Sequence, residues 1–141
     1  MTDTLYTAAA VSTGGGRDGR VRTEDGVLDL DLRMPTELGG AGGGANPESL
    51  FAAGYAACFH SALQGSARAT KVSVTGSSVT AAVSLQRDGE QGFRLAVRLD
   101  VAVPGVPREQ AQELVDAAHA ACPYSKATRG GIDVEVTLVQ D

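Results

Sequence analysis

The sequence predicts an α+β fold with antiparallel sheets, because strictly alternating strands occur together with two amphipathic helices. Apolar side chains occupy every second position in four segments, which are 27–33, 79–85, 93–103 and 132–138. A period of two buries one face of a strand and leaves the other in water, which is typical of antiparallel sheets. Segments 5–11 and 20–24 are weaker strand candidates. The order strands, helix, hairpin, helix, strand then defines the α+β class.

A hairpin is predicted over 79–103, because the turn residues Asp88, Gly89 and Gly92 separate two of the alternating segments. At 141 residues, the chain has the length of one ordinary domain with a single core, so we expect one domain over 1–141.

The first helix is predicted to begin at Pro47. Asn46 is a favoured N-cap residue, proline suits the first helical position, and Glu48 complements the helix dipole. The apolar stripe of this helix consists of Leu50, Phe51, Gly54, Tyr55, Cys58 and Ala62. Alanine and glycine fill most of its other sides, so other backbones can approach it closely. We therefore expect a central helix that is buried nearly all round.

The second helix is predicted to begin near Pro107, and Pro123 either ends it or starts a short helix at 124–128. Its apolar stripe consists of Ala111, Leu114, Val115, Ala118 and Cys122. The sequence leaves open whether Cys122 ends one helix or caps the next. One-faced sheets and an apolar helix present more apolar surface than one chain covers, which suggests a homodimer.

The charge pattern argues against nucleic acid or a membrane as a partner. The net charge is −5, and the 12 Lys and Arg residues form no run. The sequence contains no signal-peptide pattern and no apolar run of roughly 18 residues, so we expect a cytoplasmic location. Two cysteines in such a compartment are more often catalytic or redox-sensing than structural.

A glycine loop at 40–45 matches the loose form of a dinucleotide-binding fingerprint. That fingerprint needs a parallel βαβ unit and an acidic residue about 20 positions later. No Asp or Glu occurs between Ser49 and Arg87. A flexible connection is therefore the favoured interpretation of this loop.

A zinc site is the second alternative, since the chain has two Cys and two His residues near one another in sequence. Cys58 and His60 are two apart on a helix and diverge, whereas His119 and Cys122 are three apart and share a face. Two ligands make a weak site, so we expect no metal or other bound cofactor.

The two cysteines have two interpretations. Each alone is most simply a small core residue. If the fold brings them together, they can perform thiol–disulfide chemistry, but a buried thiol is inert unless a cation stabilises its thiolate. Cys58 lies mid-helix, so the cation must come from elsewhere. Arg17, in a glycine-rich turn, is the candidate, and Glu48 is the acid that could hold it; spacing alone does not place either near Cys58.

The chain resembles the organic hydroperoxide resistance (Ohr) branch of the OsmC/Ohr superfamily. The matching segments are 5–8 (LYTA), 15–19 (GGRDG), 38–40 (LGG), 46–48 (NPE), 50–59 (LFAAGYAACF), 122–125 (CPYS) and 127–130 (ATRG). The chain departs from the family pattern in having three glycines before Arg17, where two are expected. Ala45 and Ser49 also stand where Thr and Gln are expected.

This resemblance implies antiparallel sheets wrapped around central helices in an intertwined homodimer. It also implies a thiol-dependent peroxidase in which Cys58 attacks the peroxide, Cys122 resolves the product as a disulfide, and Arg17 and Glu48 form an activating pair. Alkyl and fatty-acid hydroperoxides are the implied substrates, and an external dithiol, carried by lipoylated proteins, is the implied reductant. An apolar pocket lined by residues such as Phe51 and Phe59 would favour bulky substrates.

Two other functions remain open at this point. One is a thiol redox sensor that uses the same cysteines without turnover. The other is a passive carrier of a hydrophobic ligand, in which both cysteines are inert. A sensor that binds DNA is disfavoured, because the sequence contains no basic recognition helix.

Overall fold

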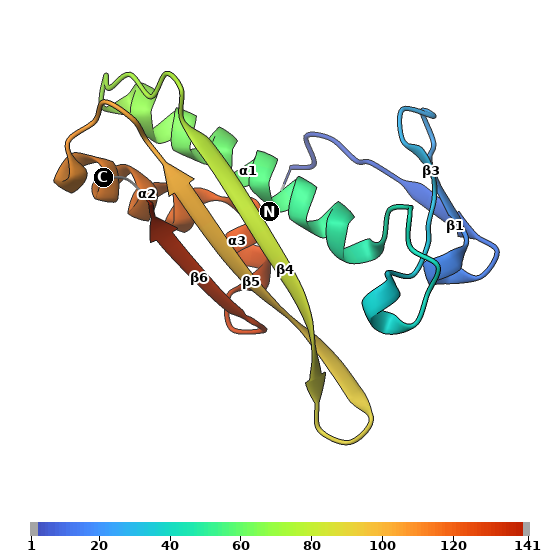
Figure 1. Ribbon diagram of the computed structural model, residues 1–141. Coiled ribbons are helices and arrows are strands. Elements are labelled where there is room, and N and C mark those ends of the chain that lie inside the picture. The colour runs from blue at the N-terminus through green and yellow to red at the C-terminus, as the bar shows by residue number, and fades with distance from the viewer. Residues whose placement is uncertain (1–2, 140–141) are drawn as a thin grey trace. The chain divides into compact units, whose positions relative to one another are not determined.

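A computed structural model describes residues 3–139, and the chain divides into two compact units, residues 1–50 and 51–141. Each unit has a three-stranded sheet of its own (Figure 1). The α+β class predicted from the sequence is confirmed. A single domain over 1–141 stays a prediction, because compactness of the units does not establish whether they unfold together.

The first unit is a small antiparallel sheet in the order β1-β2-β3. Its elements are β1 (Ala10–Thr13), the 3-10 helix η1 (Gly16–Asp18), β2 (Arg20–Thr23), β3 (Asp29–Asp31), the 3-10 helix η2 (Thr36–Leu38) and the first turn of α1 (Pro47–Ala69). The predicted strand 20–24 is confirmed, and 27–33 is shorter than predicted. The prediction of 5–11 is wrong in position, because β2 offers only four residues for pairing and these pair with Ala10–Thr13.

The second unit consists of a sheet with one antiparallel and one parallel strand pair, and of three helices that lie on one face of that sheet (Figure 1). Its strands are β4 (Ser78–Asp88), β5 (Gly92–Ala102) and β6 (Asp133–Leu138), and its further helices are α2 (Arg108–Ala121) and α3 (Pro123–Thr128). The predicted hairpin is confirmed as the antiparallel pair β4–β5.

The last strand corrects the expectation of antiparallel pairing throughout. β6 pairs with β5 in parallel, and Val97 lies opposite Val134 in the register. The cause is the connection: the chain leaves β5, crosses the sheet through α2 and α3, and returns to the end from which β5 started. Parallel neighbours require such a crossover.

The core of the second unit lies between its sheet and its helices. The predicted stripe of α2 is confirmed, since its five members are between 0% and 3% exposed. On α1 the fully buried positions repeat every four residues: Tyr55, Phe59, Leu63 and Ala67. Phe51, Cys58 and Ala62 of the predicted stripe are only partly buried.

The prediction that α1 is buried nearly all round is wrong for the single chain. Ala53, Ala57 and Ser61, which follow one another at helical spacing, are exposed. Sheet and helices cover one stripe of α1, and the small residues on its other side are left facing outward.

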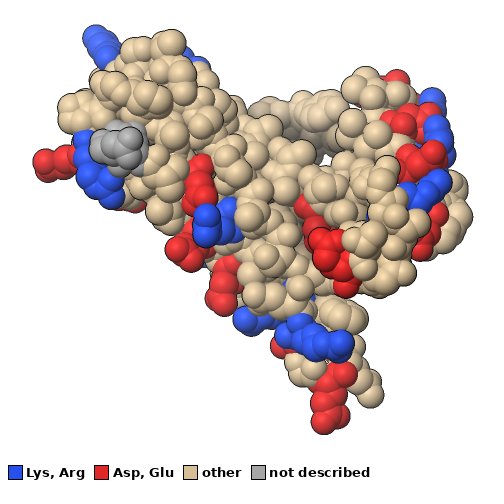
Figure 2. Space-filling view, in the orientation of Figure 1, with Lys and Arg blue, Asp and Glu red and all other residues tan. Residues whose placement is uncertain are grey.

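The surface carries mixed charge. On the face shown in Figure 2, the described Lys and Arg side chains are interspersed with Asp and Glu and form no broad basic area. Within residues 3–139, none of the helices has the length and hydrophobicity that a membrane crossing requires.

Two glycines of α1 provide a test of the packing. A Cβ atom at Gly54 would lie 2.6 Å from Tyr124 Oη and 3.2 Å from Tyr124 Cζ, whereas at Gly65 the nearest atom would be Arg68 Nη2 at 3.9 Å. Alanine in a helix interior is favoured over glycine by about 1 kcal/mol. We therefore expect Gly65→Ala to raise the free energy of unfolding by about that amount, and Gly54→Ala to lower it because the Tyr124 ring must move. Urea denaturation measures both changes, and an equal gain in both variants would contradict the packing of Tyr124 on Gly54.

Candidate functional site

Arg17 is held by a tight glycine turn between β1 and β2. Gly14 and Gly16 have φ values of 78° and 70°, which side-chain-bearing residues rarely adopt. A Cβ atom at Gly19 would collide with the carbonyl oxygen of Thr13. The carboxylate of Asp18 accepts a hydrogen bond from the Met34 amide at 2.9 Å. The turn is therefore fixed at both ends and presents the Arg17 side chain from a defined backbone.

Arg17 and Glu48 form a two-pronged ion pair within the first unit. Arg17 Nη1 donates to Glu48 Oε2 at 2.8 Å, and Nη2 donates to Oε1 at 2.7 Å. The hydrogen bond from Arg17 holds the pKa of the Glu48 carboxyl below its ordinary value and outweighs the opposing effect of burial. Two parallel bonds fix the plane of the guanidinium group as well as its position.

The start of α1 is fixed by a reciprocal cap that positions Glu48. The Ser49 amide donates to Asn46 Oδ1 at 2.8 Å, and the Asn46 amide donates to Ser49 Oγ at 3.0 Å. This is the arrangement of a capping box, with serine in place of the usual acid or amide. Ser49, one of the departures from the family pattern, thus has a local structural role. The predicted N-cap is confirmed.

Cys58 and Cys122 meet in the second unit, with their sulfurs 3.6 Å apart and no disulfide between them. Cys58 is partly exposed, whereas Cys122 is fully buried. Cys122 both ends α2 and caps α3, with an extended backbone at φ −61° and ψ 123°. The sequence left open whether Cys122 ends one helix or caps the next, and it does both. Pro123 breaks α2, and α3 begins at Pro123 itself.

The surroundings of Cys58 disfavour its thiolate. Burial raises the pKa of the Cys58 thiol, and the neighbouring Cys122 thiol raises it further. The backbone amide of Tyr124 acts in the opposite direction by hydrogen bonding to the sulfur. Within the second unit, the net effect is a thiol with a raised pKa, which is a poor nucleophile at neutral pH unless a cation is supplied.

An aromatic cluster of Phe51, Tyr55 and Tyr124 lies next to the thiols in sequence and structure. Its ring centroids are 5.6 to 6.2 Å apart in tilted and edge-on arrangements. Phe51 is partly buried and Tyr124 is 38% exposed, whereas Phe59 is 0% exposed and belongs to the core. Of the two phenylalanines predicted to line a pocket, Phe51 alone has surface to offer a ligand, because a fully buried ring cannot line an open pocket.

A buried hydrogen-bonded network beside Cys122 was missed by the sequence analysis. Ser125 Oγ lies 2.7 Å from Tyr55 Oη and 2.9 Å from His119 Nδ1, and Tyr55 Oη lies 3.3 Å from Thr128 Oγ1. The signal in the sequence was weak: a Ser and a Thr three apart on a short helix that also carries Lys and Arg neighbours. The other histidine, His60, pairs with Ser77 Oγ at 2.9 Å.

Neither the metal motif nor the glycine loop forms, within the described residues, the arrangement that its function would need. No cluster of three or more His, Cys, Asp or Glu side chains suited to a metal occurs within residues 3–139. The glycine loop at 40–45 folds back on Met34, whose carbonyl oxygen accepts the Gly42 amide at 2.9 Å. The β1–β3 sheet is entirely antiparallel, so the parallel βαβ unit that a dinucleotide fingerprint needs does not form there.

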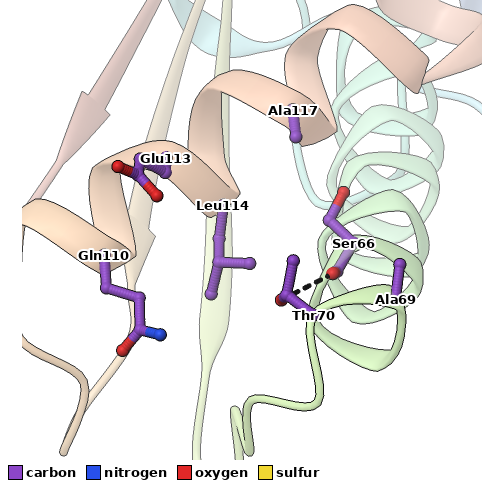
Figure 3. Close-up of a pocket in the computed structure, with 7 residues that line it drawn as sticks. All are labelled: Ser66, Ala69, Thr70, Gln110, Glu113, Leu114 and Ala117. Carbon is purple, nitrogen blue, oxygen red and sulfur yellow. Dashed lines mark hydrogen bonds between the residues drawn. The ribbon is translucent and has the colours of Figure 1, made fainter.

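A cavity of about 220 Å³ lies between the C-terminal turns of α1 and the start of α2 (Figure 3). Its lining consists of Ser66, Ala69, Thr70, Gln110, Glu113, Leu114 and Ala117. Ser66 is eight residues beyond Cys58, or about 12 Å along the helix. The cavity contains neither thiol and is separate from the candidate site.

The structure thus brings the four predicted site residues together as two pairs, Arg17 with Glu48 in one unit and Cys58 with Cys122 in the other. Two unbridged cysteines in contact, one partly exposed and one buried, form an arrangement that allows thiol–disulfide chemistry.

Comparison with known proteins identifies the family. Residues 40–137 match the family model described as OsmC-like protein. The chain is 53% identical over 137 residues to the organic hydroperoxide resistance protein of Xanthomonas axonopodis pv. citri, covering 95% of this chain and 94% of that one. It is 48% identical to OhrB of Bacillus subtilis, covering 95% and 98%.

A crystal structure of an organic hydroperoxide resistance protein from Legionella pneumophila superposes with a TM-score of 0.93 at 49% identity, covering 98% of this chain and 100% of that one. The chain belongs to the OsmC/Ohr family, in its organic hydroperoxide resistance branch. Its homologues support a role in resistance to organic hydroperoxides.

Proposed function

We propose that this protein is a thiol-dependent peroxidase that reduces organic hydroperoxides to alcohols. The observation that carries the proposal is the 3.6 Å approach of the Cys58 and Cys122 sulfurs, both reduced. The difference in exposure supports the proposed roles of the two cysteines. A hydroperoxide can reach the partly exposed Cys58, whereas Cys122 is 0% exposed and meets only what forms on Cys58.

The proposed cycle balances in three steps. The Cys58 thiolate attacks the outer peroxide oxygen, the O–O bond breaks, and the alcohol leaves after taking up a proton, which gives a sulfenic acid on Cys58. The Cys122 thiol then attacks the sulfenic sulfur; the S–S bond forms, and the hydroxyl group leaves as water with the thiol proton. A dithiol reduces this disulfide by two exchange steps and becomes a disulfide itself.

Arg17 is the proposed source of the positive charge that Cys58 needs. An adjacent guanidinium lowers a thiol pKa and stabilises negative charge on the departing oxygen. Glu48 alone would raise the thiol pKa, so its proposed role is to orient the guanidinium through the two hydrogen bonds of 2.7 and 2.8 Å.

Alkyl and fatty-acid hydroperoxides are the proposed substrates, because the partly buried Phe51 offers an apolar contact that hydrogen peroxide cannot use. Lipoylated proteins are the proposed dithiol reductants. A cytoplasmic location is part of the proposal, since dithiol reductants of this kind act in reducing compartments.

A homodimer is proposed from exposed apolar surface. In the first unit, large apolar side chains are open to solvent, among them Leu5 at 95%, Tyr6 at 79% and Val27 at 79%. On α1, Ala53 and Ala57 are exposed, and their small side chains would let a second protomer approach the helix closely. Apolar side chains on this scale mark a protein–protein interface more often than a free surface.

The peroxidase proposal is tested by counting thiols. Reduced protein treated with one equivalent of cumene hydroperoxide is expected to lose two thiols per chain, and dihydrolipoamide is expected to restore both. Cys58→Ser is expected to abolish reduction, and Cys122→Ser to reduce one equivalent and then stall or over-oxidise. Unchanged activity in Cys58→Ser, or no thiol loss in the wild type, would contradict the proposal and favour a passive carrier. Loss that no dithiol reverses would favour a sensor.

The role of Arg17 is tested by Arg17→Gln in a Cys122→Ser background, which leaves a single thiol. The Cys58 pKa, followed by thiolate absorbance at 240 nm, is expected to rise, because a stabilising cation is removed. The rate of the first step is expected to fall by about 10²-fold. The matched control is Arg20→Gln, since Arg20 also pairs with two carboxylate oxygens in the same unit, from Asp29 and Asp31. Equal effects of the two substitutions would refute a specific role for Arg17.

The homodimer is tested by sedimentation at micromolar concentration. A mass of twice the 14.4 kDa chain is expected. Val27→Asp, which places a charge on the exposed apolar surface of the first unit, is expected to shift the equilibrium toward monomer. A wild-type monomer at that concentration would disprove the dimer.

A further inference from the structure

The Ser125 hydroxyl is the centre of a buried hydrogen-bonded chain that links three helices. Ser125 of α3 is 0% exposed, and its oxygen lies 2.7 Å from Tyr55 Oη on α1 and 2.9 Å from His119 Nδ1 on α2. A hydroxyl can donate one hydrogen bond and accept two, so Ser125 can bond to both neighbours at once. Burial lowers the pKa of His119, and the nearby Arg129 charge lowers it further. In the neutral tautomer whose Nδ1 carries no proton, Ser125 donates to His119 and is free to accept from Tyr55.

Two members of this hydrogen-bonded network flank Cys122 in the sequence. His119 is three residues before Cys122 and Ser125 is three residues after it, so the His119–Ser125 hydrogen bond spans the break between α2 and α3. At this break the backbone is extended, and it is joined to the two helices by the Cys122 amide to Ala118 oxygen at 2.8 Å and the Lys126 amide to Cys122 oxygen at 3.0 Å. The Cys122 thiol is hydrogen-bonded to the Cys58 sulfur, 3.6 Å away. The position of the thiol therefore depends on how the break is held.

We propose that Ser125 is a positioning residue for disulfide formation: by joining Tyr55 and His119 across the α2–α3 break, it holds the Cys122 thiol against Cys58. This inference rests on the proposed peroxidase cycle. Ser125 touches no reacting atom and acts through the 122–125 segment. That segment also contains Tyr124, whose amide is hydrogen-bonded to the Cys58 sulfur.

The step that depends most on this placement is the fate of the sulfenic acid. Once Cys58 carries the S–OH group, either Cys122 condenses with it or a second hydroperoxide oxidises it to the sulfinic acid, releasing a second alcohol. The first reaction is intramolecular and gains from the short sulfur–sulfur distance, whereas the second depends on hydroperoxide concentration. The ratio of disulfide to sulfinic acid therefore reports the placement of Cys122 and is independent of how fast the sulfenic acid forms.

The test measures this ratio by intact mass after reduced protein reacts with excess cumene hydroperoxide. The disulfide lowers the mass by two hydrogens, and the sulfinic acid raises it by two oxygens. In Ser125→Ala the fraction of sulfinic acid is expected to rise about three- to tenfold relative to the disulfide, the change that corresponds to one buried hydrogen bond. Ser77→Ala is the matched control, because it removes the other Ser–His hydrogen bond, 2.9 Å to His60, and its ratio is expected to equal that of the wild type.

The outcomes separate the two proposals. A Ser125→Ala ratio equal to that of the wild type, with the disulfide formed in both, overturns the positioning role and leaves the peroxidase cycle intact. Failure of the wild type to form either product overturns the cycle itself. If Ser125→Ala does not fold, Tyr55→Phe provides the second variant, since it keeps the ring and removes only the Tyr55 hydroxyl, which is hydrogen-bonded to Ser125 and Thr128. Its ratio is expected to shift in the same direction, and an unshifted ratio overturns the inference.

Discussion

The cost of ionising a thiol away from bulk water is the constraint on which the candidate site depends. Burial and the neighbouring Cys122 both raise the Cys58 pKa, and the hydrogen bond from the Tyr124 amide opposes them. A thiolate at neutral pH therefore needs a positive charge that is itself held in place. The Arg17 guanidinium is a positive charge held in this way, because its two hydrogen bonds to Glu48 fix the guanidinium plane. The glycine turn before β2 and the Asn46–Ser49 cap on α1 are the local features that position each partner.

The difference in exposure between the two cysteines also follows from local sequence. Pro123 cannot continue α2, so the chain breaks at Cys122 and restarts as α3, with the Cys122 side chain at the end of the buried α2 stripe. Cys58 lies on α1 one position before the core residue Phe59, at the margin of the buried stripe. A helix periodicity of 3.6 residues thus leaves one thiol accessible and the other enclosed, and the two are still in contact.

The features that could be predicted from the sequence are those set by short-range periodicity and by terminal residues. They include the β4–β5 hairpin, the α2 stripe, the Asn46 cap and the break at Pro123. The parallel pairing of β6 and the short β1 could not be predicted, because alternation reports which face is buried and not which neighbour a strand pairs with. Arg17 and Glu48 are 31 positions apart, and Cys58 and Cys122 are 64 positions apart. Residue chemistry suggested both pairings, but spacing alone did not place the members of either pair near each other. Phe59, which was expected to line a substrate pocket, lies in the core because it falls on the buried stripe of α1.

The polar network around Ser125 is costly as a means of stabilisation. A buried hydroxyl must lose water and find partners, and apolar side chains of similar size would fill the same space without that requirement. The network restricts how the three helices pack. Hydrogen bonds between Tyr55, Ser125 and His119 are satisfied in few arrangements of the helices, whereas apolar contacts tolerate sliding. This restriction matters most where a helix is interrupted, and Cys122 lies at the interruption between α2 and α3. Every buried side-chain nitrogen or oxygen in residues 3–139 has a partner, so the cost of burial is offset in the arrangement that brings the two sulfurs together.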